Sequence, residues 1–198
     1  MRIFLTVLIF ILNIQSWTQA DDIKEFEIEG LSVGSSLLDH FSQKKIKSSI
    51  VDWYDDLEKN RYVSLAFNSP NFETYEFVDV WTKYNDNKYL IDTIAGVVYF
   101  GKDKPIKNIE NCYQEQSTIA NELMQLFTEA KKTGPETSKH SGDPSGKSTY
   151  TDIILELSGD YEVVIACYDW SDELLKTQNK ADHLYVSIRS LELEKWLN

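Results

Sequence analysis

The stretch of this sequence with the clearest chemical character is "SGDPSGKST", residues 141–149. It places Gly146, Lys147 and Ser148 in the order in which a nucleotide-binding P-loop presents them to phosphate. The full pattern also needs a glycine at position 141, where this chain has Ser141. A P-loop follows a buried strand and opens a helix, so that backbone N–H groups converge on phosphate. This stretch instead follows a helical pattern and precedes a strand-like one, and we therefore expect it not to bind phosphate.

Residues that could provide nucleophilic catalysis are few and scattered. The histidines His40, His140 and His183 fall in an expected helix, a connector and the start of an expected strand. A cysteine hydrolase needs a free thiolate beside an imidazole, with backbone donors for the oxyanion, and no motif pairs a thiol with any of the three. The sequence therefore indicates no catalytic residue.

The chain carries no metal or cofactor motif. It lacks HExxH, paired CxxC, and an acidic calcium loop with the required glycine. The acidic cluster Asp52, Asp55, Asp56 and Glu58 is the nearest candidate for a cation site, although a solvated turn explains it more simply. We expect no cofactor and no bound metal.

The amino terminus has the features of a Sec-type signal peptide. Met1 and Arg2 precede an apolar run, residues 3–12, and Thr18 and Ala20 supply the small residues of a cleavage site. The alternative is a membrane anchor, but a spanning helix needs about 20 apolar residues and this run is far shorter. We predict cleavage after Ala20, a periplasmic or secreted location, and no membrane span after cleavage.

The charge of the chain limits its partners. The sequence has 20 Lys and Arg against 32 Asp and Glu, for a formal net charge of −12. Nucleic acids and anionic membranes favour cationic surfaces, so we expect neither as a partner. A protein or a component of the cell envelope remains, and the oligomeric state stays open.

The pattern of apolar residues predicts an α+β fold. Residues 21–198 have the length of one domain with a single core. Apolar residues recur between 109 and 131 at steps of three, four and seven, which indicates an amphipathic helix. Strand-like runs, rich in aromatic and β-branched residues, occur at 25–30, 61–67, 74–84, 89–101, 149–158, 160–170 and 183–193. We expect a mainly antiparallel sheet of about six strands with one long helix on a face, preceded by short N-terminal helices capped by Ser35 or Ser36 and by Ser42.

The two cysteines are predicted to form a disulfide. Cys112 lies on the apolar face of the expected helix, and Cys167 shares one strand face with Val163 and Ile165. If the helix packs on that face, the two sulfur atoms meet, and an oxidising compartment favours their bond. Two reduced, buried cysteines are the alternative.

Residues 133–148 are predicted to be a flexible surface loop, because they contain prolines, glycines and many hydroxyl side chains. Lys139, His140 and Lys147 make this loop locally basic on an acidic protein. This contrast could steer an acidic partner to the loop, or the lysines could simply pair with neighbouring carboxylates.

Asp169 and Trp170 lie where an expected strand ends, and Ser171 can cap a short helix that follows. An exposed Trp170 beside the basic loop would suit a binding surface. The candidate binding edge therefore comprises Lys139, His140, Lys147, Asp169 and Trp170.

Four segments together resemble a family of small exported, periplasmic proteins of marine alphaproteobacteria. They are "IEGLSVGSSLLDHF" (28–41), "YLIDTIAGVVYF" (89–100), the helix that contains Cys112, and "DPSGKST" followed by "VVIACYDWS" (163–171). The resemblance implies a periplasmic or envelope location. It implies no reaction and assigns no functional residue.

Two classes of function remain. The first is a non-catalytic periplasmic or secreted protein that binds a protein or an envelope component through its sheet edge or its long loop. The second is a small periplasmic hydrolase whose active site is assembled from dispersed residues. An open site in which His140 or His183 meets a carboxylate and an exposed serine would favour the hydrolase.

Overall fold

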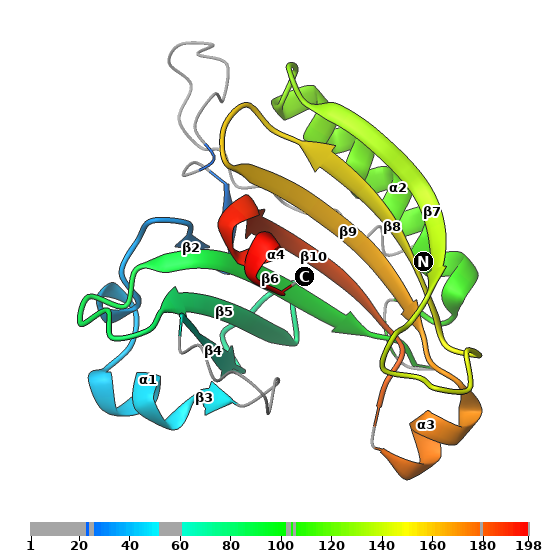
Figure 1. Ribbon diagram of the computed structural model, residues 1–198, viewed down its shortest axis with the longest axis horizontal. Coiled ribbons are helices and arrows are strands. Elements are labelled where there is room, and N and C mark those ends of the chain that lie inside the picture. Colours follow the sequence, from blue (N-terminus) through cyan, green and yellow to red (C-terminus); the bar gives the residue numbers. More distant parts are fainter. Residues whose placement is uncertain are drawn as a thin grey trace.

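The computed structural model describes residues 23, 26–51, 61–101, 104, 106–178 and 180–197. The predicted signal peptide with its cleavage site after Ala20, and the acidic cluster within residues 52–58, lie outside this part of the chain. The elements in chain order are β1 (Glu27–Ile28), β2 (Leu31–Ser32), the 3-10 helix η2 (Leu37–Asp39), α1 (Gln43–Ser48), β3 (Ile50–Val51), β4 (Tyr62–Phe67), β5 (Phe77–Lys83), β6 (Ile91–Tyr99), α2 (Ile109–Leu126), β7 (Lys131–Lys139), β8 (Thr149–Glu156), β9 (Tyr161–Asp169), α3 (Asp172–Thr177), β10 (His183–Ser190) and α4 (Leu191–Leu197) (Figure 1).

One antiparallel sheet dominates the described structure. Its eight strands have the order β3-β4-β5-β6-β10-β9-β8-β7, and each neighbouring pair is antiparallel. β1 and β2 form a separate two-stranded sheet. The predicted α+β class and antiparallel sheet are confirmed, whereas the expected number of about six strands is too low.

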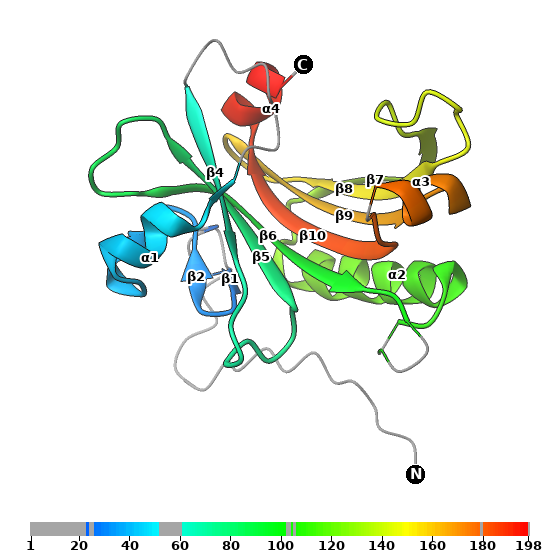
Figure 2. The same cartoon turned by 90° about the horizontal axis from the view of Figure 1, so that it is seen from below.

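The two faces of the sheet differ in what covers them. α2 lies along one face of the β7–β10 half, and α4 lies on the opposite side of the sheet (Figure 2). Every second residue of each strand points toward α2, and the residues on this face are apolar. In β8 and β9 they include Ile153, Leu155, Val163 and Ile165, all buried. The N-terminal segment, with Leu31 and Leu37, joins the same core.

α2 is attached to the sheet by a disulfide and by hydrogen bonds one turn further along. Cys112 and Cys167 form the predicted disulfide, with 6.0 Å between their Cα atoms, and both are 0% exposed. Gln116, on the same buried face of the helix, donates hydrogen bonds from Nε2 to the backbone carbonyls of Thr151 and Ile165, at 2.8 and 2.6 Å. α2 is therefore held to β8 and β9 by covalent, polar and apolar contacts.

Several predicted elements end a few residues earlier than expected, the long helix and the last strand among them. The helix predicted to reach Lys131 ends at Leu126, and the N–H of Phe127 donates the last helical hydrogen bond, to Leu123. The strand predicted to reach residue 193 ends at Ser190, because the Ser190 Oγ accepts a hydrogen bond from the N–H of Leu193 and so caps α4. α4 then buries Leu193 in a small apolar cluster with Tyr62 and Trp81.

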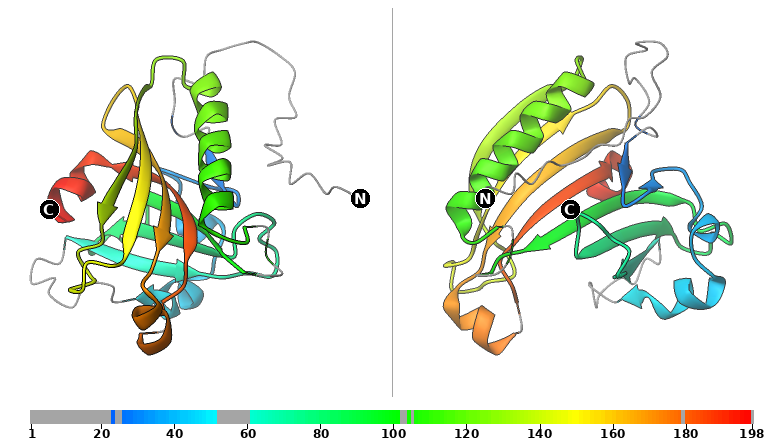
Figure 3. Two further views of the ribbon diagram at one scale, coloured as in Figure 1. Left: turned by 90° about the vertical axis from the view of Figure 1, so that its right-hand side faces the viewer. Right: turned by 180° about the vertical axis from the view of Figure 1, so that it is seen from behind.

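The prediction of a loop at residues 133–148 is wrong for its first half. Residues 133–139 belong to β7, which pairs with β8 and is the outermost strand at its end of the sheet (Figure 3). Only residues 140–148 connect β7 to β8. β7 was missed because its residues are exposed on both faces and show no alternation of apolar and polar side chains.

Candidate functional site

The connection between β7 and β8 is organised by one carboxylate. Asp143 accepts hydrogen bonds from the N–H groups of Ser145 and Ser148, both at 2.9 Å, and from the Ser148 hydroxyl at 2.6 Å. These bonds, the one from the Ser148 hydroxyl foremost, hold the pKa of Asp143 well below its usual range. The Ser148 Oγ in turn accepts from the N–H of Ser171, the residue before α3, at 3.0 Å. "SGDPSGKST" is therefore an Asp-centred turn between two strands, tied to the start of α3.

Trp170 is buried, so the exposed indole on which the binding-edge hypothesis depended is not found. Its side chain is only 8% exposed, its ring centroid lies 4.3 Å from that of His140, and Lys180 places its Nζ 4.8 Å from the ring centroid. Its backbone N–H donates to Asp182 at 2.7 Å. The connection folds over the end of β9 and brings His140 onto the indole, a contact that local sequence does not reveal. The binding-edge hypothesis thereby loses its main support.

The structure brings together only part of the candidate binding edge. His140 and Trp170 are in ring contact, whereas Lys139, Lys147 and Asp169 are exposed. Lys139 and Asp169 both lie opposite Thr149, on β7 and β9 respectively, so β8 separates them. The five residues therefore surround one end of the β7–β9 sheet without forming a single cluster.

A row of aromatic side chains crosses the sheet near this end. Tyr150, Tyr168, His183 and Tyr99 lie directly opposite one another on β8, β9, β10 and β6. Their successive ring centroids are 5.8, 4.6 and 6.0 Å apart, and the Tyr168 and His183 rings are nearly parallel, at 11°. The sequence did not indicate this row, because it depends on the register of four strands. The row forms an aromatic cluster separate from the apolar core, and His140 in the β7–β8 connection packs against it.

Burial disfavours the charged form of His183, which belongs to this row, and of His140, which packs against it. Burial lowers the pKa of His140, and it lowers the pKa of His183 to about 4. The His183 Nδ1 donates to the Ala181 carbonyl at 2.7 Å, and the His140 Nδ1 accepts from the N–H of Gly142 at 3.0 Å. Neither histidine forms an ion pair with a carboxylate of the described residues. Among the described residues, the ion pair between histidine and carboxylate that a histidine-based hydrolase would use is therefore not seen at either of them.

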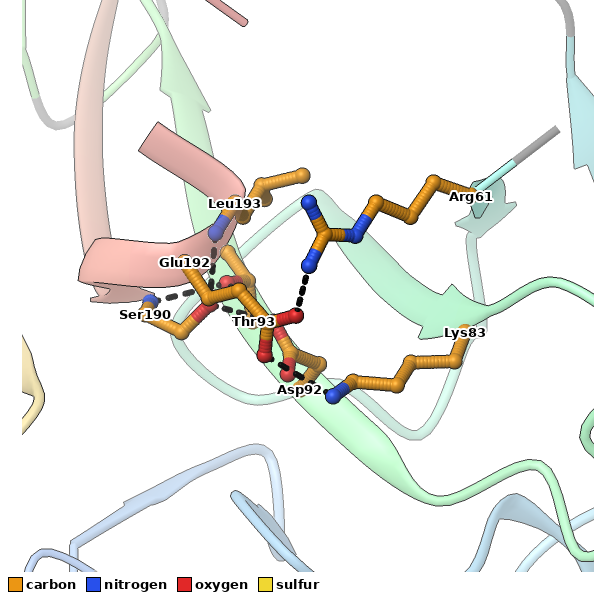
Figure 4. Close-up of polar contacts among 7 residues, drawn as sticks. All are labelled: Arg61, Lys83, Asp92, Thr93, Ser190, Glu192 and Leu193. Carbon is orange, nitrogen blue, oxygen red and sulfur yellow. Dashed lines mark hydrogen bonds and ion pairs between the residues drawn. The ribbon is translucent and has the colours of Figure 1, made fainter. Parts of the chain in front are cut away.

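A second polar cluster lies where α4 begins (Figure 4). The Asp92 carboxylate accepts a hydrogen bond from the Ser190 hydroxyl, and the Ser190 N–H donates to the Thr93 Oγ1 at 3.1 Å. Burial raises the pKa of the Asp92 carboxyl, an effect that the Ser190 hydrogen bond opposes. A carboxyl group with a raised pKa can act as a general acid. Here the Asp92 carboxylate instead accepts the hydrogen bond of Ser190, the residue that caps α4.

Glu192 completes this cluster through ion pairs. Its carboxylate pairs with the Arg61 guanidinium and, at 2.8 Å, with the Lys83 Nζ (Figure 4). Arg61 immediately precedes β4 and Lys83 ends β5, so these pairs join the first turn of α4 to the β4–β5 half of the sheet. The cluster is accounted for by the anchoring of α4.

β7 presents an open edge at the end of the sheet. It pairs with β8 on one side, and no strand of the described residues pairs with its other side. A bulge at Gly134 and Pro135 divides it, since the register shifts between Thr133 and Glu136. The second half, Glu136–Lys139, is regular, and its residues lie opposite 149–152.

The side chains of this half point alternately to the two faces of the sheet. The Thr137 Oγ1 shares a hydrogen bond of 2.8 Å with the Thr151 Oγ1, which donates to the hydroxyl of Tyr113 on α2 at 3.3 Å. Thr137 therefore faces α2. By strand alternation Lys139 faces the same way, and Glu136 faces the opposite way.

Some backbone N–H and C=O groups of this half are not used in pairing with β8. The N–H of His140 donates to the carbonyl of Ser148 at 3.0 Å, so this pair marks a hydrogen-bonded position of the ladder. In an antiparallel pair such positions alternate along the strand. The N–H and C=O groups of Thr137 and Lys139 consequently point away from β8, toward the open side.

In the described part of the chain no helix has the length and apolar character of a membrane-spanning segment. Comparisons with protein-family models, with curated proteins and with solved structures give no match.

Proposed function

We propose that this chain is an exported, non-catalytic binding protein that holds a partner protein by adding an extended segment of that partner to β7. The observation that carries this proposal is the regular, exposed half-strand Glu136–Lys139 at the end of the eight-stranded sheet. An edge of this kind offers main-chain hydrogen bonds to an incoming strand, which is a recurrent way of binding peptides.

The competing interpretation is that β7 is a protected edge. Sheets avoid unwanted pairing through bulges, prolines and lysines on their edge strands, and the bulge at Gly134 and Pro135 has this effect on the middle of β7. It does not extend to Thr137 and Lys139, which are exposed and whose backbone N–H and C=O groups point away from β8. The bulge thus prevents pairing at the middle of β7, and the half-strand Glu136–Lys139 remains able to pair.

Export is supported by the disulfide. Cys112 and Cys167 are joined in the core, and structural disulfides persist in oxidising compartments such as the periplasm or the outside of the cell. The periplasmic or secreted location predicted from the amino terminus is part of this proposal.

Two substitutions at one position test strand addition. Thr137→Pro removes the outward N–H that an added strand would bind, and Thr137→Val keeps that N–H while losing the same hydroxyl contact with Thr151. We expect wild type and Thr137→Val to retain the same partner on affinity capture from the native envelope fraction, and Thr137→Pro to lose it. Equal recovery by all three proteins would show that binding does not use this edge.

A further inference from the structure

The charges on β7 specify what its partner segment carries. We propose that the segment runs antiparallel to β7 with an acidic residue opposite Lys139 and a basic residue opposite Glu136. In the partner's own sequence the acidic residue then precedes the basic one by three positions. This inference rests on the proposed function and deepens it.

Lys139 is the cation of β7 that is left for a partner. Lys131 forms an ion pair with Glu156 on β8 at 3.2 Å, and the Lys132 Nζ contacts the Asn121 side-chain oxygen on α2 at 3.3 Å. Lys139 is exposed and forms no ion pair with the described residues. A carboxylate on an added strand, directly opposite Lys139, would supply the missing counter-ion.

Glu136, by contrast, would be stabilised by a cation on the partner segment. It lies directly across the β7–β8 pair from Asp152, so two carboxylates face each other on the side of the sheet away from α2. Burial raises the pKa of Asp152, and the neighbouring charge of Glu136 raises it further. Like charges directly opposite destabilise a strand pair. A cation placed on the outer side of Glu136 would relieve this repulsion.

The spacing of the two charges sets the partner's pattern. Glu136 and Lys139 are three residues apart and therefore face opposite sides of the sheet, and the partner residues opposite them must alternate in the same way. All neighbouring strands of the large sheet are antiparallel, and antiparallel pairing is slightly more stable per residue than parallel pairing. An antiparallel partner meets Lys139 first and Glu136 three residues later.

A second copy of this chain does not fit. If two β7 strands paired about a two-fold axis perpendicular to the sheet, residues of the same face would lie opposite one another. Lys139 and Glu136 face opposite sides of the sheet, so neither could lie opposite the other. A register that puts Lys139 opposite Thr137 puts Glu136 opposite His140, and one that puts Glu136 opposite Ser138 puts Lys139 opposite Pro135. Neither charge would gain a counter-ion, so the edge favours a different protein.

Two peptides of identical composition test the pattern. The probes are acetyl-TVETVKVT-amide, in which the acidic residue comes first, and acetyl-TVKTVEVT-amide, in which the charges are exchanged. Each is titrated into the isotope-labelled full chain, and the amide shifts and hydrogen exchange of Thr137 and Lys139 are followed by NMR. We expect the first peptide to bind about tenfold more tightly, because two cross-strand charge pairs change from attractive to repulsive. Its binding should slow exchange of these two amides.

The double variant Glu136→Lys with Lys139→Glu provides the matched control. Both side chains are exposed, so the exchange should leave the fold intact, and the variant should prefer the second peptide by a similar factor. The Thr137→Pro variant should bind neither peptide.

The outcomes separate the two proposals. Equal affinity for the two peptides, or tighter binding of the second by wild type, would overturn the charge pattern and leave strand addition standing. If neither peptide moves the Thr137 and Lys139 amides, strand addition itself is overturned. A dimer found by sedimentation and dissociated by Thr137→Pro would show that the partner is a second copy.

Discussion

The carboxylate of Asp143 determines how residues 140–148 leave one strand and enter the next. It is buried and accepts hydrogen bonds from two N–H groups and one hydroxyl. Through Ser148 it also reaches the start of α3. The sequence of this stretch resembles a phosphate-binding loop, but its hydrogen-bond donors, on Ser145 and Ser148, bind the carboxylate of Asp143 within the same stretch.

Asp143→Asn is predicted to lower the thermal unfolding midpoint. The amide nitrogen that replaces one carboxylate oxygen is a donor, so it cannot accept from the donors of Ser148. Amide exchange at Ser148 and Ser171 should speed up in the variant. Lys147→Gln, an exposed change on the same connection, serves as the control and should leave both measurements unchanged.

His183 is predicted to make the protein less stable in mild acid. Its folded-state pKa is about 4 against an ordinary value of 6.5. Above pH 6.5 the imidazole is neutral in both states. As the pH falls from 6.5 toward 4, the unfolded chain takes up a proton that the folded chain refuses, and stability drops by on the order of 3 kcal/mol at most.

The comparison that isolates this effect is wild type against His183→Phe, which keeps a ring in the aromatic row. Urea unfolding at pH 7.5 and at pH 4.5 should show a larger loss of stability for wild type than for the variant. Equal losses in the two proteins would show that other groups govern the acid response.

Helices and strands with a regular spacing of apolar residues could be predicted from the sequence. A strand that exists only through its pairing with a neighbouring strand could not. The helix around Cys112 and the strand around Cys167 follow periods of about 3.6 and two residues, which is why their disulfide could be predicted. β7 has no such rhythm, because both of its faces are exposed and it is a strand only through its pairing with β8.

The candidate site was predictable only in part for the same reason. Lys139 and His140 could be named as residues of a basic segment, but the side to which Lys139 points depends on the β7–β8 register and its bulge. The burial of Trp170 depends on His140 and Lys180 packing onto it from other segments. Local sequence carries neither kind of information.

Gln116→Leu is predicted to weaken the attachment of α2 to the sheet. The change removes both hydrogen bonds from the buried side chain and leaves the carbonyls of Thr151 and Ile165 without that donor. We expect the free energy of unfolding to fall by about 1–3 kcal/mol in chemical denaturation. Gln114→Leu, on the exposed face of the same helix, should change it by less than about 0.5 kcal/mol.

At the scale of the whole molecule, one core runs beneath both halves of the sheet. It joins Leu37 and Phe67 near the N-terminal segment to Leu123 of α2 and Ile165 of β9. The disulfide spans a sequence separation of 55 residues within this core. It therefore restricts the unfolded chain as well as holding two folded elements together.

Removing the disulfide is predicted to cost about 4 kcal/mol, the chain-entropy value for a loop of this size. The Cys112→Ala, Cys167→Ala double variant should unfold at markedly lower denaturant concentration than wild type. A reductant should leave folded wild type unaffected at first, since both sulfur-bearing residues are 0% exposed. A double variant as stable as wild type would contradict the prediction.

The position of β10 in the sheet has a consequence for how the protein is made. β10 is the last of the described strands along the chain, yet it lies between β6 and β9 and is the strand that joins the two halves. Because a chain is synthesised from its N-terminus, the other seven strands of the large sheet are made before the joining strand is. Until then β6 and β9 each expose an unpaired edge, a state prone to misassembly. The sheet is completed by inserting a strand at its middle, and folding of the whole must wait for residues 183–190.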